Sequence, residues 1–215
     1  MKNYPEKSLY FVLTSSYNLA VTTVEIAKNA ILGGIDILQM REKNFSETKL
    51  IDTGKELAML CKKNDVVFIV NDSPIIAKQV NADGVHLGQE DLHKFPLTKT
   101  RQILGQDKII GLSTHSMEQF EIANESDLDY IAFGPIFPTK TKNYFIGTED
   151  VEKVLTIAKK PIVFIGGINF SNIDILLNKG AKNIAVISAI INSANMTRTA
   201  RQLKSKISDG EKCKL

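Results

Sequence analysis

The chain has 215 residues, 43% of them hydrophobic and 24% charged, a composition typical of a globular protein with one large domain. A formal net charge of +3 is too small to indicate a nucleic-acid surface, and no basic stripe is interleaved with aromatic residues. The longest apolar runs are far shorter than the roughly 20 residues of a membrane span, so we expect neither nucleic acid nor membrane as a partner.

The two cysteines predict neither a disulfide framework nor a metal site. Cys61 lies in a helical pattern and Cys213 in a polar tail, far away along the chain. The first apolar run, Leu9–Leu13, is shorter than the roughly 7–15-residue core of a secretory signal. We therefore expect a first strand there and a reduced, cytoplasmic compartment; the sequence leaves a homo-oligomer open.

Short apolar runs typical of strands alternate with amphipathic segments along the whole chain. The predicted strands are, in chain order, Leu9–Leu13, Ile35–Met40, Val66–Val70, Gly84–Leu87, Ile109–Leu112, Tyr130–Phe133, Ile162–Ile165 and Ile184–Ile187. The predicted helices between them include Thr22–Leu32, Ser46–Lys63 and Asn172–Lys179. Eight such units predict an α/β fold, a (β/α)8 TIM barrel forming a single domain over residues 1–208, with a polar tail over 209–215.

A doubly wound open sheet is the competing architecture. Such a sheet usually carries a glycine-rich turn after its first strand. Here the first strand is followed by Thr14-Ser15-Ser16-Tyr17, which contains no glycine. The barrel is therefore favoured, with Ser46 placed to cap a helix and Gly33-Gly34 and Gly180 placed to end helices.

Three loops carry residues suited to phosphate groups. The segment Gly134-Pro135-Ile136-Phe137-Pro138-Thr139-Lys140-Thr141-Lys142 breaks the strand before it and presents hydroxyls, cations and unpaired backbone N–H groups. Gly166-Gly167-Ile168-Asn169 and Ile187-Ser188-Ala189 repeat the pattern of an apolar strand followed by small polar residues. The three loops together predict an enzyme that acts on phosphorylated small molecules.

Polar side chains also follow the predicted strands, at the end of a barrel where catalytic groups gather. Alternation along the second strand places Gln39, Arg41 and Lys43 on one side, toward the barrel mouth. Asp72 and Asp91 follow neighbouring strands, and two carboxylates with a substrate phosphate are typical ligands of Mg²⁺. With cations around the same anion, this arrangement would stabilise a departing pyrophosphate.

Each of these residues also has a purely structural interpretation. Asp72 stands directly before a Ser-Pro pair and could cap the next helix, and Asp91 alone could be a solvated loop acid. Arg41 and Lys43 could pair with surface acids such as Glu42, which contributes about 0–1 kcal/mol and no function. Their occurrence on successive strand ends of one barrel favours the functional interpretation.

The chain resembles the thiamine-phosphate synthase (thiamine-phosphate pyrophosphorylase) family from about Leu9 to Arg201. The resemblance rests on motifs in the family's order: Gln39-Met40-Arg41-Glu42-Lys43, Val70-Asn71-Asp72, Ala82 to Asp91, Gly111-Leu112-Ser113-Thr114-His115, Gly134 to Lys142, Ile165-Gly166-Gly167-Ile168-Asn169 and Ala185 to Ile190. It implies a (β/α)8 barrel, a transferase that joins 4-amino-2-methyl-5-hydroxymethylpyrimidine diphosphate to a thiazole phosphate. The products would be thiamine phosphate and pyrophosphate, with Mg²⁺ required.

The resemblance also implies a role for each matching residue. The pyrimidine diphosphate would contact Gln39, Arg41, Lys43, Asn71 and Ser113, and Lys142 would lie against its diphosphate. Mg²⁺ would be held by Asp72 and Asp91. The thiazole phosphate would lie against Thr139, Thr141, Gly167, Ile187 and Ser188, the last two through backbone N–H groups. Arg41, Lys43, Ser113 and Lys142 are the expected catalytic residues.

Two other functions stay open for this barrel. A thiazole tautomerase of the same fold would use His115 as an acid–base catalyst and would not need the metal pair. A non-catalytic thiamine-phosphate-binding regulator would tolerate loss of Asp72, Asp91 or Lys142, and none is lost. We expect His86, within an apolar run, to be a satisfied core or rim histidine.

Overall fold

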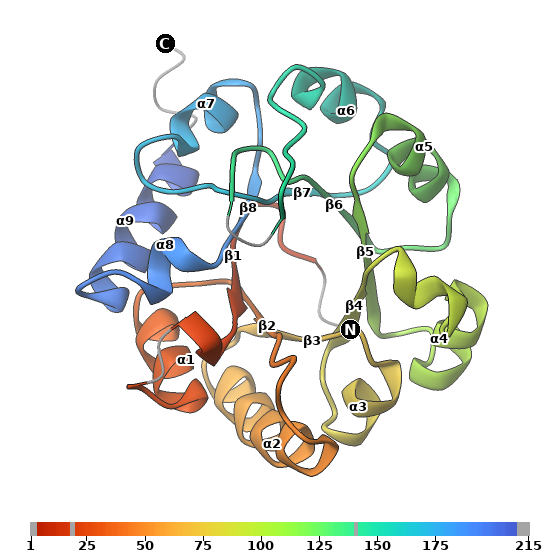
Figure 1. Cartoon of the computed structure of the whole chain (residues 1–215), viewed down its shortest axis with the longest axis vertical. Coiled ribbons are helices and arrows are strands. Elements are labelled where there is room, and N and C mark those ends of the chain that lie inside the picture. The colour runs from red at the N-terminus through yellow and green to blue at the C-terminus, as the bar shows by residue number, and fades with distance from the viewer. Residues whose placement is uncertain (1–3, 18–19, 140–141, 210–215) are drawn as a thin grey trace.

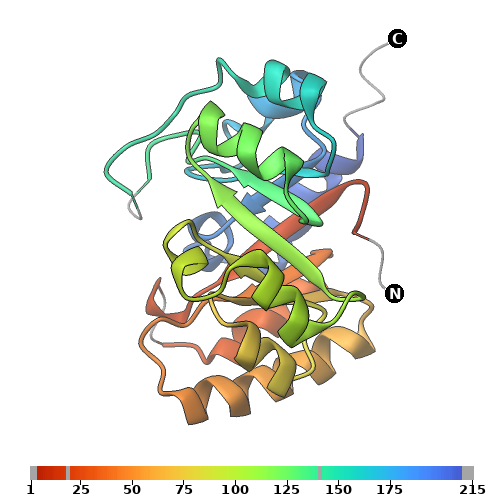
Figure 2. The same cartoon turned by 90° about the vertical axis from the view of Figure 1, so that its right-hand side faces the viewer.

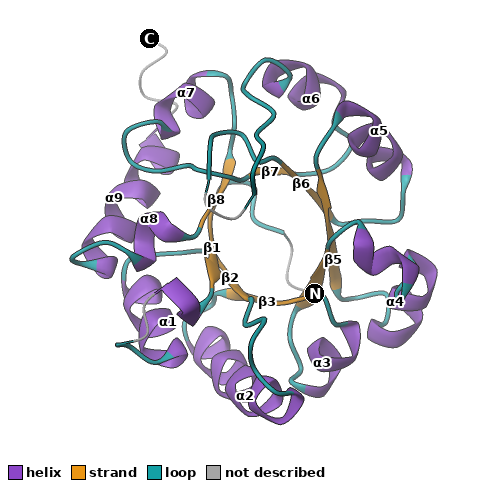
Figure 3. Cartoon of the chain, viewed as in Figure 1, coloured by secondary structure: helices purple, strands orange, loops and turns teal. Residues whose placement is uncertain are grey.

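The computed structural model describes residues 4–17, 20–139 and 142–209. Its eight parallel strands pair in chain order, and the pairing of the last strand with the first closes the barrel. Figure 3 shows the strands as an inner ring and the helices as an outer ring. The predicted single-domain (β/α)8 barrel is therefore confirmed.

The elements follow the predicted order, and each strand bound lies within two residues of the prediction. The strands are β1 (Ser8–Leu13), β2 (Ile37–Met40), β3 (Val67–Asn71), β4 (Gly84–Leu87), β5 (Ile109–Thr114), β6 (Tyr130–Phe133), β7 (Ile162–Phe164) and β8 (Asn183–Val186). The helices are α1 (Thr23–Leu32), α2 (Glu47–Lys63), α3 (Pro74–Gln79), α4 (Leu97–Leu104), α5 (Met117–Glu125), α6 (Val151–Ile157), α7 (Ile173–Asn178), α8 (Ser188–Ile191) and α9 (Met196–Asp209). Two 3₁₀ turns, η1 (Ser15–Tyr17) and η2 (Glu90–His93), and the short helix α8 were not predicted.

The predicted N-cap of α2 at Ser46 and the predicted end of α1 at Gly33 are confirmed. The Ser46 hydroxyl accepts a hydrogen bond from the backbone N–H of Lys49, which caps α2. Gly33 ends α1 and touches α9 so closely that an added Cβ would lie 2.4 Å from the Cβ of Ala200. Helix α9 reaches Asp209, and residues 210–215 lie outside the described residues, so the boundary between domain and tail stays a prediction.

The barrel has two apolar layers. One lies between the strands and the helices; the other fills the barrel interior and includes Tyr10, Ile69 and Tyr130, all of them buried. Figure 1 shows the ring of helices around this centre. Side chains that fill the interior make the lower part of the barrel a packed core, so a ligand is expected at the end formed by the carboxyl ends of the strands.

Aspartates tie neighbouring strands together before the strands reach that end. Asp36 precedes β2, and its Oδ2 accepts a hydrogen bond from the backbone N–H of Leu9 in β1 at 2.7 Å. Asp83 and Asp129 precede β4 and β6 and make the equivalent bonds to Phe68 and Ile110, at 2.9 and 2.8 Å. These bonds help to set the register of each strand pair and thereby the level of the polar residues at its carboxyl end.

The loop between β6 and α6 projects from one end of the barrel, and the described residues that lead into β1 lie at the other end (Figure 2). Its first part runs beside the loop after β7: the N–H of Phe137 donates to the carbonyl oxygen of Gly166 at 3.0 Å. Its return is fixed by a bond from the N–H of Ile146 to the carbonyl oxygen of Pro135, at 2.8 Å. We call this segment, Gly134–Gly147, the β6 loop.

Candidate active site

One pocket lies at the carboxyl ends of the strands and collects most of the predicted site residues. Eleven of them line it: Gln39, Arg41, Lys43, Asn71, Asp72, Ser113, Thr139, Lys142, Gly167, Ile187 and Ser188. Of the other two, Thr141 lies outside the described residues, and Asp91 does not line the pocket but interacts with Asp72, which does. The structure therefore brings together residues that are up to 149 positions apart in the chain.

The end of β2 sorts its side chains as alternation predicts. Arg41 and Lys43 line the pocket, whereas Glu42 lies on the other side and is buried. The Glu42 carboxylate accepts hydrogen bonds from the backbone N–H of Ser15 at 2.8 Å and from the Thr23 hydroxyl at 2.9 Å. The interpretation of Arg41 and Lys43 as partners of Glu42 is therefore wrong, because Glu42 holds the β1–α1 connection instead.

The positions of Asp72 and Asp91 depend on the ends of β3 and β4 and on a left-handed backbone conformation at Asp72. Asp72 directly follows β3 with a φ of +65°, and its N–H donates to the carbonyl oxygen of His86 at 2.8 Å. Asp91, in η2, accepts a hydrogen bond through Oδ2 from the N–H of Gly88 at 2.7 Å. Ser73, and not Asp72, caps α3, since its hydroxyl accepts from the N–H of Ile76. The helix-cap interpretation of Asp72 is therefore wrong.

Burial and the neighbouring Asp91 raise the pKa of Asp72 to about 6, although Lys43 and Arg41 oppose the shift. Two carboxylates in contact repel each other unless a proton or a cation lies between them. In the described part of the chain, no group of three or more His, Cys, Asp or Glu residues could hold a metal. A pair of carboxylates nevertheless fits Mg²⁺, which takes one or two carboxylates and fills its octahedron with substrate phosphates and water.

The opposite side of the pocket is built from backbone. Gly166 and Gly167 have φ values of +103° and +65°, which side chains other than glycine rarely adopt. A Cβ on Gly167 would lie 2.4 Å from the carbonyl oxygen of Pro138 in the β6 loop. After β8 the chain turns at Ile187 into α8, and no side chain caps that turn. This side therefore presents backbone groups where a phosphate could approach closely.

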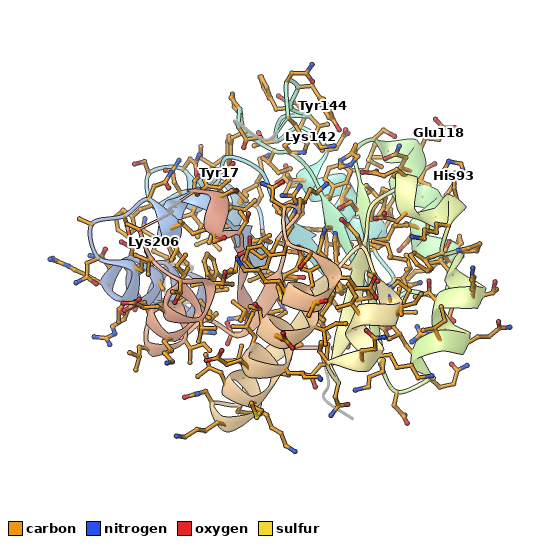
Figure 4. The ribbon with its side chains drawn as sticks, turned by 60° about the horizontal axis from the view of Figure 1, so that its bottom comes forward. Tyr17, His93, Glu118, Lys142, Tyr144 and Lys206 are labelled. Carbon is orange, nitrogen blue, oxygen red and sulfur yellow. The ribbon has the colours of Figure 1, made fainter. Side chains whose placement is uncertain are left out.

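The β6 loop brings a cation and an aromatic ring over the pocket. Thr139 and Lys142 form an isolated antiparallel bridge, and both line the pocket. Figure 4 shows Lys142 and Tyr144 together on this loop, at the top of the view. The Tyr144 ring meets His115 edge-on, with 6.0 Å between the ring centroids.

Five polar side chains form a continuous hydrogen-bonded chain that passes through the barrel interior and has both of its ends at the pocket. Gln39 Nε2 donates to the Tyr10 hydroxyl at 2.7 Å, and that hydroxyl lies 2.8 Å from the hydroxyl of Tyr130. The Tyr130 hydroxyl lies 2.7 Å from His86 Nδ1, and His86 Nε2 lies 2.8 Å from Ser113 Oγ. We call these five residues the polar chain; sequence reasoning assigned no role to Tyr10 or Tyr130, which lie within apolar strands.

His86 is a satisfied interior histidine, as predicted. Both of its ring nitrogens have partners, and burial together with His115 and Arg41 lowers its pKa to about 3. The ring is therefore neutral at physiological pH.

Among the residues that the structure describes, no helix is long and apolar enough to cross a bilayer.

Similar proteins identify the family of the chain. The model of the family described as thiamine monophosphate synthase matches residues 9–190. The thiamine-phosphate synthase of Persephonella marina is 41% identical over 199 residues, which cover 92% of this chain and 94% of that protein. The thiamine-phosphate synthase of Halalkalibacterium halodurans is 38% identical over 194 residues, covering 89% and 90% of the two chains.

A solved structure agrees as well. The thiamine phosphate pyrophosphorylase from Pyrococcus furiosus is 33% identical, with a TM-score of 0.85, and the match covers 94% of this chain and 96% of that one. The chain therefore belongs to the thiamine monophosphate synthase family and is a transferase of thiamine biosynthesis.

Proposed function

We propose that the chain condenses 4-amino-2-methyl-5-hydroxymethylpyrimidine diphosphate with a thiazole phosphate to give thiamine phosphate and pyrophosphate. One observation carries the proposal: the cations Arg41, Lys43 and Lys142 share a pocket with Asp72, opposite the backbone loops after β7 and β8. A diphosphate would lie at the cations, and the phosphate of the second substrate would lie at the loops.

The reaction breaks the bond between the pyrimidine methylene carbon and the diphosphate oxygen. Its electron pair leaves with the diphosphate, and the lone pair of the thiazole nitrogen then forms the new bond to the methylene carbon. The amino-substituted ring delocalises positive charge from the methylene carbon, so the bond to oxygen can break first. This dissociative route needs no protein nucleophile; it needs stabilisation of the charge on the leaving group.

The chain's own residues supply that stabilisation. Arg41 and Lys43 would contact the diphosphate from the end of β2, and Lys142 from the β6 loop above it. Gln39, Asn71 and Ser113 would hold the pyrimidine lower in the pocket. Departure of the diphosphate with the bonding electron pair is favourable only while its negative charge stays among these donors.

Mg²⁺ fits the proposal as the required cofactor, with Asp72 and Asp91 as its protein ligands. When bound, the ion would neutralise phosphate charge as a Lewis acid. The raised pKa of Asp72 supports this assignment, because a cation relieves the same repulsion that a proton relieves in the metal-free protein.

The second substrate needs to be held rather than activated. We assign its phosphate to the backbone of Gly167, Ile187 and Ser188 and to Thr139, with Thr141 of the β6 loop outside the described residues. Placing the thiazole nitrogen beside the methylene carbon turns the second step into an intramolecular one, which lowers its entropic cost.

A thiazole tautomerase is the second candidate, since His115 lines the pocket and could act as a base. It leaves the cation set and the carboxylate pair without a role. A non-catalytic regulator has no observation in its favour, because every expected catalytic group that the structure describes lies at the pocket. A cytoplasmic location and a homo-oligomer stay predictions.

The test is a product assay with both phosphorylated precursors and Mg²⁺. The proposal predicts thiamine phosphate and pyrophosphate in equal amounts. Formation of an isomerised thiazole phosphate alone would support the tautomerase instead. Binding of thiamine phosphate without turnover would support the regulator.

A further inference from the structure

The polar chain links two of the proposed pyrimidine contacts, Gln39 and Ser113, through three residues that have no assigned role. Gln39, Tyr10, Tyr130 and His86 are all buried. A buried hydroxyl or ring nitrogen must find a partner, so the protons in such a chain are placed by its neighbours and not by solvent. The order of donors and acceptors can therefore be followed from one end to the other.

The chain has a single direction once its first bond is known. Gln39 Nε2 can only donate, so the Tyr10 oxygen accepts from it. Tyr10 has one proton, and among the described residues its only other partner is the hydroxyl of Tyr130, so Tyr10 donates to Tyr130. The proton of Tyr130 then goes to Nδ1 of His86.

The histidine passes this direction on. With Nδ1 accepting, neutral His86 carries its proton on Nε2 and donates to Ser113 Oγ. The Ser113 hydroxyl proton has no acceptor in the described part of the chain, and Ser113 lines the pocket. At the opposite end, Gln39 Oε1 has no partner among the described residues and is not fully buried, so it is open to the pocket as an acceptor.

We infer that Tyr10, Tyr130 and His86 are positioning residues that set the hydrogen-bond polarity of the pyrimidine site. The site offers an acceptor at Gln39 and a donor at Ser113. This pattern suits a ring that carries an amino group and an unprotonated ring nitrogen, so the inference rests on the proposed function and deepens it. A 4-oxo ring with a protonated nitrogen presents the reverse pattern.

The connection between the two ends makes the discrimination cooperative. Gln39 cannot turn its amide to suit an oxo group unless every bond of the polar chain reverses with it, including the tautomer of His86. Each contact is therefore held by the other. A wrong ligand leaves buried polar groups without partners. This costs far more binding free energy than one misplaced contact with a flexible side chain.

The packing around Tyr130 holds the middle of the chain in place. A Cβ on Gly111 would lie 2.0 Å from Cζ and 2.5 Å from the hydroxyl oxygen of Tyr130, so the glycine in β5 leaves the room that this side chain occupies. The Tyr130 ring also stacks with Tyr4 and with His86, at centroid distances of 4.9 and 5.5 Å. The ring has little freedom to move its hydroxyl away from Nδ1.

The tautomer of His86 tests the inference without any variant or turnover. The chain has only three histidines, so their ring nitrogens can be assigned in ¹⁵N spectra of the full, ligand-free protein. We expect His86 to carry its proton on Nε2, with Nδ1 unprotonated. A proton on Nδ1 alone would mean that the chain runs the other way, and a proton on both nitrogens would leave it without a single direction; either result would overturn the inference.

Ligand selectivity tests its consequence. Calorimetry with Mg²⁺ but without thiazole should show that the protein binds the 4-amino pyrimidine diphosphate about 10³-fold more tightly than the 4-oxo analogue. Tyr130→Phe keeps the ring but breaks the chain, so this ratio should fall at least about tenfold. Tyr4→Phe is the matched control, because the Tyr4 ring stacks on Tyr130 but its hydroxyl makes no hydrogen bond to any member of the polar chain.

An unchanged ratio in Tyr130→Phe, or an equal fall in Tyr4→Phe, would contradict the inference, as would failure of both diphosphates to bind the wild-type protein. The proposed function fails separately. Selective binding of the amino compound without formation of thiamine phosphate would refute the synthase activity and leave the polarity of the site intact.

Discussion

His115 Nδ1 lies 2.6 Å from the carbonyl oxygen of Gly134, the first residue of the β6 loop. Because a carbonyl oxygen only accepts, the histidine donates from Nδ1, and in its neutral form the lone pair is on Nε2. His115 lines the pocket. A histidine that transfers protons needs such a free Nε2 lone pair at the pocket. Replacing His115 therefore distinguishes the synthase from the tautomerase.

Replacing His115 by Asn keeps a donor near Gly134 and removes Nε2. The synthase account predicts that His115→Asn lowers kcat for thiamine phosphate formation by less than about tenfold, because departure of the diphosphate needs no protein base. A tautomerase would lose about 10²–10⁴-fold. The two rates can be measured on the same preparation by following both products.

Lys142 provides a test of the leaving-group site. Its ammonium group lies on the β6 loop, 6.0 Å from the Tyr144 ring centroid. A backbone hydrogen bond lowers the pKa of Glu90 in the pocket wall, and the charge of Lys142 adds to that shift. We expect Lys142→Ala to lower kcat by about 10²-fold or more. The KM for the thiazole phosphate should change much less, since Gly167, Ile187 and Ser188 supply most of its proposed contacts from the loops after β7 and β8.

The control is Lys153→Ala, which removes an exposed lysine of the same sign on α6. Its kinetics should match the wild type. Equal effects of Lys142→Ala on kcat and on the thiazole KM would contradict the placement of Lys142 at the diphosphate.

The two carboxylates proposed to bind the metal should lower the stability of the metal-free protein. In the metal-free protein the pKa of Asp72 is raised from 3.8 to about 6, first by burial and then by Asp91. The folded state thus holds this proton more tightly than the unfolded state, so the stability it confers is present below pH 3.8 and is lost as the pH rises through 6. Metal-free Asp72→Asn should therefore exceed the wild type in stability above pH 6 and lose this advantage in acid.

Urea unfolding of both proteins in chelator, at pH 4 and at pH 8, measures this difference. Asp91→Asn should in turn lower the pKa of Asp72, which a ¹³C titration of the carboxyl groups would detect. A stability difference that does not vary with pH, or an Asp72 pKa that is unmoved by Asp91→Asn, would count against the pair.

Gly167 predicts a coupling between the β6 loop and the loop after β7. Gly167→Ala places a side chain at a φ of +65° and 2.4 Å from the carbonyl oxygen of Pro138. We expect a loss of about 1–3 kcal/mol in the free energy of unfolding and a higher KM for the thiazole phosphate.

Gly105→Ala is the matched control, because Gly105 has a φ of +94° but no atom within 4 Å of the added Cβ. It should share the backbone strain and leave both KM values unchanged. A thiazole KM that is equal in the two variants would show that the close approach to Pro138 has no role in binding.

The sequence predicts the wall of the pocket better than its floor. Gln39, Arg41 and Lys43 were placed correctly because alternation along a strand is a local rule. Tyr10 and Tyr130 stand within apolar strands, and nothing local distinguishes them from core residues. Their hydroxyls are 120 positions apart in the chain and meet only in the folded barrel, so their hydrogen bond could not be predicted.

Glu42 shows a second limit of local reasoning. It stands between two site cations, so pairing with them was the natural structural interpretation. Its partners Ser15 and Thr23 belong to the preceding strand's connection, 27 and 19 positions away. The short helix α8 was missed for a simpler reason: four residues are too few to show a helical period.

The most direct measurement of the central claim follows release of pyrophosphate and formation of thiamine phosphate from the two precursors, with Mg²⁺ and with chelator. We expect equal amounts of both products with Mg²⁺, and loss of at least about 10²-fold in rate with chelator or in Asp72→Asn and Asp91→Asn, whose folds stay intact by circular dichroism. Undiminished synthesis in chelator and in both variants would contradict the claim that a metal held by this pair stabilises the leaving diphosphate.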